Sequence, residues 1–380
     1  MYGFLPGPFD RNLRSIDNAS AIRSPVEADA ISTSDTVSPR KEDTMEPDAL
    51  EPIVDRRISR RQMLGWSSVA LAAGGRARVA HAQAWVGNAG GLDLSLDYNF
   101  SHSDKVVGDT PSSGGAQIEF PNGGSTTHQF TLGVEYNPID KLAVNVSLPY
   151  QLLRYNGQLN LYPHLGGGAY DDGNTHGTFT DLRGGVRYQV LDGSIALAPS
   201  LGVSIPIADY ETVGNTVAGR HLKALHLGAA VGYLIGESTY VHFAYEFSLV
   251  EKASHGVTKN PVDAANLEKH GQNHHDATLT VGHKLLDQRL DLHLDANGRV
   301  TDGGVSFSDI VPRSGTSPLS ADEQLFHDLI LNEDMLLVGG GAGYQLTDTV
   351  SLSLSARLFV KGINTQNASV VAFGVTWSPL

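Results

Sequence analysis

Apolar and polar side chains alternate with a period of two over much of the chain. Leu92, Leu94 and Leu96 share one face of an extended segment, while Asp93 and Ser95 share the other. This period predicts β-strands, because successive side chains on a strand point to opposite faces. The pattern recurs in twelve segments: 92–101, 130–136, 142–150, 182–190, 197–207, 225–233, 241–249, 277–281, 290–296, 336–344, 350–360 and 371–377.

The connections between these segments alternate in length. Short links carry the Gly, Pro, Asn, Asp or Ser typical of tight turns, and they lie at 137–140, 191–194, 236–238, 286–288 and 346–349. Longer links lie at 103–125, 154–178, 208–220, 251–274 and 300–334, with a shorter one near 362–367. Short turns at one end and long loops at the other are typical of membrane barrels. We therefore predict an all-β fold over residues 85–380, a transmembrane, antiparallel, up-and-down β-barrel of about 12 strands.

Aromatic residues lie on the apolar face beside the short turns. If the chain enters from the periplasm, they form an interfacial girdle at that end: Tyr136, Tyr188, Tyr233, Tyr344 and Trp377. A second set could form the opposing belt: Tyr98, Phe100, Tyr150, Tyr245 and Phe247. A soluble β-sandwich is the alternative, but it would not leave the other face polar on nearly every strand.

The polar face carries many ionisable side chains. In a barrel these residues line the lumen: Asp93, Asp97, Glu135, Arg183, Arg187, His226, His242, Glu246, Lys284, Asp291, His293, Asp295, Arg299 and Arg357. Unpaired charges are costly in a dry core, so these groups must meet partners, water or both. Two interpretations follow, a selective polar passage and a ladder of ion pairs that plugs a narrow barrel.

The N-terminal part of the chain has a different character. Residues 1–58 lack an apolar period and are expected to be disordered, or an extension upstream of the true start. Residues 59–84 resemble a twin-arginine-like signal peptide, with Arg60 and Arg61, a short apolar run, and cleavage expected after Ala84. That run is too short to span a bilayer as a helix.

Composition narrows the partners and the chemistry. The chain has 42 glycines, no cysteine and only 18% charged residues, which favours strands and turns and excludes disulfides and thiolate sites. The basic and acidic residues of 1–84 cancel, so the net charge of −14 resides in 85–380. An acidic body excludes nucleic acid as a partner. The expected partners are outer-membrane lipid, the barrel-assembly machinery and a small-molecule solute.

Few residues suggest catalysis or metal binding. Ser101, His102 and Ser103 form a close Ser/His grouping, but neighbours on a strand point to opposite faces. In the long 251–274 link and just beyond it, His270, His274 and His275 have a spacing that could ligate zinc or copper, although a solvated histidine cluster explains them as well. We therefore predict no catalytic residues, no metal, no cofactor and no enzyme.

Residues 181–191 (DLRGGVRYQVL) and 201–210 (LGVSIPIADY) resemble a family labelled putative meta-pathway of phenol degradation proteins. The resemblance is tightest over 178–210 and continues in strand rhythm to Trp377. Where Thr-Gly is common this chain has Ile207-Ala208, and residues 378–380 follow its last aromatic residue. The resemblance implies a Gram-negative outer-membrane channel or transporter, with hydrophobic or aromatic compounds as candidate solutes. The alternatives are a structural or surface-binding barrel with a closed lumen and a lipid-modifying enzyme.

Overall fold

The structure is a computed structural model that describes residues 84–107, 117–119, 124–157, 170–212, 214, 216–254, 269–304 and 332–379. In this part of the chain, no helix has the length and apolar character needed to cross a membrane. The predicted N-terminal extension and signal peptide lie outside the described residues, apart from Ala84.

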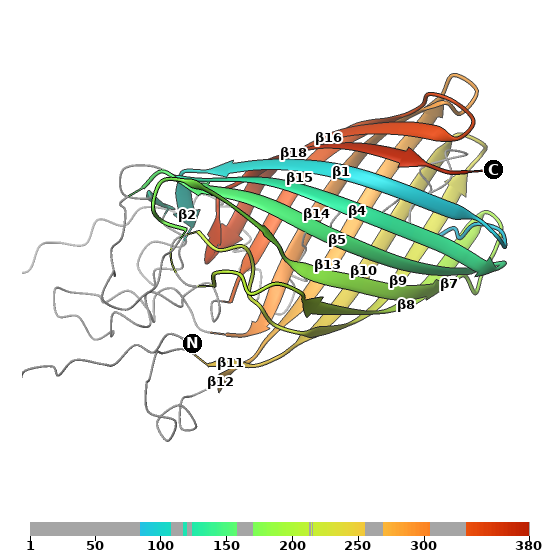
Figure 1. Cartoon of the computed structure of the whole chain (residues 1–380). Helices are drawn as coiled ribbons and strands as arrows, with labels where there is room; N and C mark the ends of the chain where they lie inside the picture. Colours follow the sequence, from blue (N-terminus) through green and yellow to red (C-terminus); the bar gives the residue numbers. More distant parts are fainter. Residues whose placement is uncertain are drawn as a thin grey trace, which may run out of the picture. The chain divides into compact units, whose positions relative to one another are not determined.

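Antiparallel strands form the wall of a closed barrel with twelve wall positions among the described residues (Figure 1). One position is shared by two short strands, β6 (Thr175–Phe179) and β7 (Asp181–Tyr188), which pair with the same neighbour. The other strands are β1 (Leu92–Ser103), β4 (Ser125–Ile139), β5 (Leu142–Tyr155), β8 (Ile195–Pro206), β9 (Ala224–Ile235), β10 (Thr239–Val250), β13 (Gln272–Leu285), β14 (Leu290–Gly303), β15 (Asp334–Gln345), β16 (Val350–Ile363) and β18 (Ser369–Trp377).

The first and last strands close the ring. β1 pairs with β18 from Leu94 opposite Trp377 to His102 opposite Ser369, and its other edge pairs with β4. Each wall strand except the short β6, which pairs with β5 alone, therefore has a partner on both sides, and the ring is closed. The predicted fold class, a 12-stranded antiparallel barrel, is confirmed.

Short strands extend the loop end of the barrel. β2 (Lys105–Val107) pairs with both β3 (Gln117–Glu119) and β17 (Thr365–Gln366), and β11 (Ala253–Ser254) pairs with β12 (Lys269–His270).

The two faces of the wall differ in burial as the alternation predicts. Outward apolar side chains remain accessible, with Leu294 72% and Leu354 57% exposed, whereas the inward Asp93 is only 4% exposed. An accessible apolar outer surface around a closed barrel matches a lipid environment, in which backbone groups must find their partners within the wall.

Tight turns join strands at the end opposite the long loops. Lys141, Gly193 and Gly236 have positive φ values of 68°, 118° and 65°, and residues 286–288 have values of 53° to 70°. Left-handed conformations of this kind reverse the chain within a few residues. The aromatic residues predicted beside these turns are exposed, and each pairs with the beginning of a neighbouring strand: Tyr136, Tyr188, Tyr233, Tyr344 and Trp377.

Two predicted loops are shorter than expected. The link predicted at 251–274 was too long, because β13 begins at Gln272, and the link predicted at 154–178 ends where β6 begins at Thr175. In both places polar side chains on the outward face conceal the strand period. These strand ends extend beyond the apolar band, where outward side chains no longer need to be apolar.

We expect opposite effects from placing one charge on the two faces of β16. Leu354→Arg puts a guanidinium into the lipid-facing band and should lower folding stability by about 2–4 kcal/mol. Ser353→Arg faces inward in register with Gly374, above which Asp97 also lies, and should change stability by less than about 1 kcal/mol. Urea titration of barrels folded in lipid vesicles, read by heat-modifiable gel mobility, measures both. Equal losses would contradict the assignment of the two faces.

Candidate functional site

The barrel interior collects the ionisable residues that the polar face predicted. Each of them alternates with outward apolar side chains, and those with at most 9% exposure are Asp93, Asp97, Glu135, His226, His242, Lys284, Asp291 and Asp295. The remaining ones are partly buried: Arg183, Arg187, Glu246, His293, Arg299 and Arg357. Whether these residues pair along the wall or across the lumen determines whether they line the interior or fill it.

Arg187 on β7 binds Glu135 on β4. One guanidinium nitrogen donates to both carboxylate oxygens at 2.7 and 2.9 Å. The pair reaches across β5, which presents the short side chains of Ala143 and Asn145 between them. It therefore lies along the wall.

Arg357 on β16 binds Asp295 on β14 in the same way. Nε lies 3.0 and 3.1 Å from the two carboxylate oxygens, and a second nitrogen donates at 2.8 Å. Between them in the same row lies Gly339 of β15, where a Cβ atom would come within 2.0 Å of the Ala356 carbonyl oxygen. Glycine at this position therefore fits the close backbone of β16 and places no side chain between the two charged groups.

A third group joins β7, β9 and β10. Arg183 donates to Glu246, and Nδ1 of His226 lies 3.3 Å from the same carboxylate. His226 also contacts Ser248 through Nδ1 at 2.8 Å and Ser204 through Nε2 at 3.1 Å.

This Glu–His–Ser arrangement escaped the sequence analysis because its members are far apart in the chain. It resembles a nucleophile–base–carboxylate set in connectivity. However, the ladders of β8 with β7 and β9 engage the backbone around Ser204, so the strand offers no free N–H pair for an oxyanion. We interpret the group as a polar cluster of the wall.

A fourth group surrounds Asp291. Tyr240 donates to its carboxylate at 3.0 Å, and Lys284 is opposite it in register and 5.8 Å from the Tyr240 ring centroid. Nδ1 of His293 lies 3.4 Å from the same carboxylate oxygen. The group spans β10, β13 and β14, which are neighbours in the wall.

At the loop end, Glu333 joins two arginines. Its carboxylate lies 3.3 Å from Arg220 and 3.5 Å from Arg299, which also binds Asp276 at 3.1 Å. Burial alone would raise the pKa of Glu333, but the two guanidinium groups and the Thr365 hydroxyl hold it below its ordinary value. Arg220 belongs to the β8–β9 connection and Glu333 precedes β15, so this contact joins two connections whose strands β9 and β15 are four places apart in the wall. The sequence analysis missed both residues because loops carry no period.

The β8–β9 connection also packs onto the inner wall. Tyr210 is 4% exposed, contacts Leu153 and Ala218, and donates a hydrogen bond to Asp181. In return, the His221 backbone N–H donates to the Tyr210 oxygen at 2.9 Å. The connection predicted as a loop at 208–220 thus narrows the mouth at the loop end.

The segment before β1 lies against the opposite end of the interior. Trp85 covers the inward face of Gly232, where a Cβ atom would come within 2.1 Å of the indole. Ala84 packs with Ala196 and Ala230 in the same cluster. The Trp85 indole N–H donates to Gly193 at 3.3 Å, and the Val86 N–H donates to Gln189 at 2.7 Å. A bay of small residues therefore holds an aromatic side chain inside the mouth at the turn end.

The described residues offer little for metal or serine chemistry. No group of three or more His, Cys, Asp or Glu residues in the described ranges is placed to hold a metal ion. His274 faces inward, where Arg220 contacts it at 2.8 Å, while its neighbour His275 faces outward against Tyr245. The ring of His102 contacts Thr126 at 3.0 Å, whereas Ser103 bonds to the Lys105 carbonyl.

No family model matches the chain, and no curated protein matches it. The resemblance of residues 178–210 to a phenol-degradation family therefore stays a prediction.

Solved structures share the architecture. An outer membrane channel from Pseudomonas putida F1 has a TM-score of 0.56, covering 78% of this chain and 97% of its own, at 11% identity. The translocator domain of an autotransporter from Neisseria meningitidis has 0.43, covering 76% and 88% at 12% identity. A monoaromatic hydrocarbon channel has 0.38, covering 83% and 95% at 11% identity. At such identities the likeness to the first establishes the fold alone, and this chain is a β-barrel of the bacterial outer membrane.

Proposed function

We propose that the barrel conducts small molecules across the outer membrane through a lumen lined by paired charges. The observation that carries the proposal is that the ion pairs between wall strands run along the wall and do not cross the lumen. They join strands at most three places apart in the wall, as β7 and β10 are, whereas opposite strands of twelve are six apart. Pairs of this reach line a lumen without crossing it. A carboxylate and a guanidinium on such a wall favour a hydrated interior, because desolvating both is costly.

Both mouths are narrower than the wall alone would make them. Trp85 occupies the periplasmic end, and the contact of Arg220 with Glu333 joins two connections at the extracellular end. Because both mouths are constricted, we expect only small solutes to pass. The same constrictions are compatible with the rival function, a structural or surface-binding barrel whose lumen is closed.

The solute class rests on two kinds of support. The charged wall favours small water-soluble molecules, because such solutes exchange hydration for polar side chains at little cost. The resemblance of residues 178–210 implies hydrophobic or aromatic compounds instead. Parallel flux assays with a neutral sugar and a monoaromatic compound distinguish the two.

The purified barrel should produce stepwise ion conductance in planar lipid bilayers. The physical reason is a continuous hydrated path along the paired charges. Liposome swelling with small sugars provides an independent measurement of solute flux. Absence of both conductance and flux, from protein whose gel mobility shows a folded barrel, would rule out the channel function.

Breaking one wall pair should change ion selectivity in a predictable direction. Arg357→Gln leaves Asp295 unbalanced and should raise the cation-to-anion permeability ratio by roughly twofold, while Asp295→Asn should lower it by a similar factor. The double variant removes both charges and should return near the original ratio. Reversal potentials in a salt gradient measure each ratio, and unchanged values in both single variants would place this pair away from the permeation path.

Removing the indole of Trp85 should widen the periplasmic mouth. We expect Trp85→Ala to raise single-channel conductance by roughly twofold, because the ring occupies lumen volume over Gly232. Tyr233→Ala is the matched control, since it removes an aromatic ring from the outward face of β9, the strand that carries Gly232. An equal conductance in the Trp85 variant and the original chain would show that the constriction lies elsewhere.

A further inference from the structure

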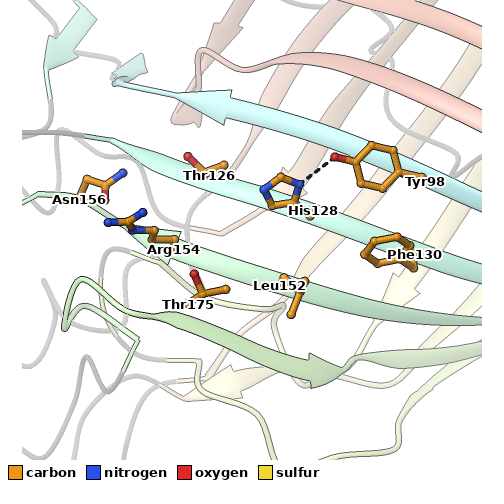
Figure 2. A pocket seen from close by; sticks show the side chains of 8 residues that line it. All are labelled: Tyr98, Thr126, His128, Phe130, Leu152, Arg154, Asn156 and Thr175. Atoms are coloured by element: carbon orange, nitrogen blue, oxygen red, sulfur yellow. Dashed lines mark hydrogen bonds between the residues drawn. The ribbon is translucent and has the colours of Figure 1, made fainter.

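The outer surface of the barrel has a hollow that the channel function does not use. It has a volume of about 650 Å³ and lies over β1, β4, β5 and β6 near the loop end (Figure 2). The residues that line it are Tyr98, Thr126, His128, Phe130, Leu152, Arg154, Asn156 and Thr175. Those on the three long strands occupy the outward positions of the alternation, so the hollow opens toward the membrane and not into the lumen.

The lining is divided into an apolar part and a polar part. Phe130, Leu152 and the Tyr98 ring form the end nearer the middle of the membrane, and the Tyr98 hydroxyl bonds to His128 at 2.8 Å. Thr126, Arg154 and Thr175 gather at the other end, beside Asn156 (Figure 2). Arg154 follows the belt residue Tyr150 by four positions, or about 13 Å along the strand. The predicted belt, which includes Tyr150, would place this polar end at headgroup level.

Arg154 supplies the only formal charge among the lining residues. Its Nε donates to the Gly173 carbonyl at 3.2 Å, which fixes the guanidinium, and no described carboxylate pairs with it. The nearby Asp172 is engaged by His176 at 2.7 Å and by Asn174 at 2.8 and 2.9 Å. Arg154 is thus an exposed cation with no carboxylate partner among the described residues, on a protein whose net charge is −14.

A second aromatic–histidine group on the far side of the wall provides an internal comparison. Tyr245 bonds to His275 at 2.8 Å as Tyr98 bonds to His128, and the Phe247 and His275 rings lie 5.1 Å apart. In the first group, Arg154 lies opposite Thr126, two residues before His128. In the second group, Asp302 lies opposite Asn273, two residues before His275. The aromatic group thus recurs in the barrel, while the cation distinguishes the hollow.

We propose that this hollow binds a phosphorylated lipid of the outer leaflet. Its phosphate meets the Arg154 fork with Thr126 and Asn156 as further donors, and an acyl chain lies along Phe130 and Leu152. Charge complementarity supports a phosphate, since guanidinium groups match its oxygens bidentately. The order of the lining, apolar toward the membrane core and cationic above it, supports a lipid as the source of that phosphate.

The test measures binding of lipid A to the purified barrel in detergent by native mass spectrometry. We expect the phosphorylated form to bind about tenfold more tightly than the dephosphorylated form, and Arg154→Gln to abolish that difference. Arg154→Lys keeps the charge without the fork and should give an intermediate affinity. The matched control is Lys361→Gln, which removes an exposed cation from the loop end of β16 and should leave binding unchanged.

Three results would overturn the proposal. The first is equal affinity of the original chain and Arg154→Gln, both with the gel mobility of a folded barrel. The second is an equal loss in Lys361→Gln, which would indicate attraction by charge alone. The third is displacement of the lipid by inorganic phosphate at equal concentration, which would assign the site to free phosphate. Conductance is recorded on the same samples, so failure of the lipid site is distinguishable from failure of the channel.

Discussion

Backbone hydrogen bonding in lipid is the constraint on which this structure depends. A strand edge exposed to hydrocarbon would leave its N–H and C=O groups unpaired, at a cost of several kcal/mol each. The pairing of β1 with β18 closes the ring, although these strands are separated by nearly the whole barrel sequence. Once the ring is closed, every second side chain must face lipid and the rest must face the interior. The division into apolar and charged faces follows from that closure.

The interior then has to accommodate charge without a dry core. Gly339 provides one solution, because the absence of a side chain lets Asp295 and Arg357 meet across it. At the loop end a different solution appears, in which Arg220 and Glu333 come from connections and not from the wall. The paired charges along the wall line the lumen, and the contact of Arg220 with Glu333 narrows its mouth.

The sequence was sufficient to predict the twelve wall segments, the faces of their apolar parts and the turns, because a period of two determines which residues share a side. It could not predict partners. Arg187 and Glu135 were both expected to face inward, yet their contact depends on the register of β4, β5 and β7, which alternation does not determine. The position of Trp85 also escaped prediction, since a single aromatic residue before the first strand has no periodic neighbours. His274 and His275 were assigned to a loop because their strand continues beyond the apolar band, where outward residues become polar.

The docking of Trp85 has a consequence for the order of assembly. Its bay is built from Ala196, Ala230 and Gly232, which belong to strands in the middle of the chain. The bay is complete only after those strands have paired, so a residue near the beginning of the barrel sequence reaches its final place late. An indole that leaves water for a protein wall changes its fluorescence emission. In a chain carrying Trp377→Phe, Trp85 is therefore an optical reporter that distinguishes a finished barrel from an assembly intermediate.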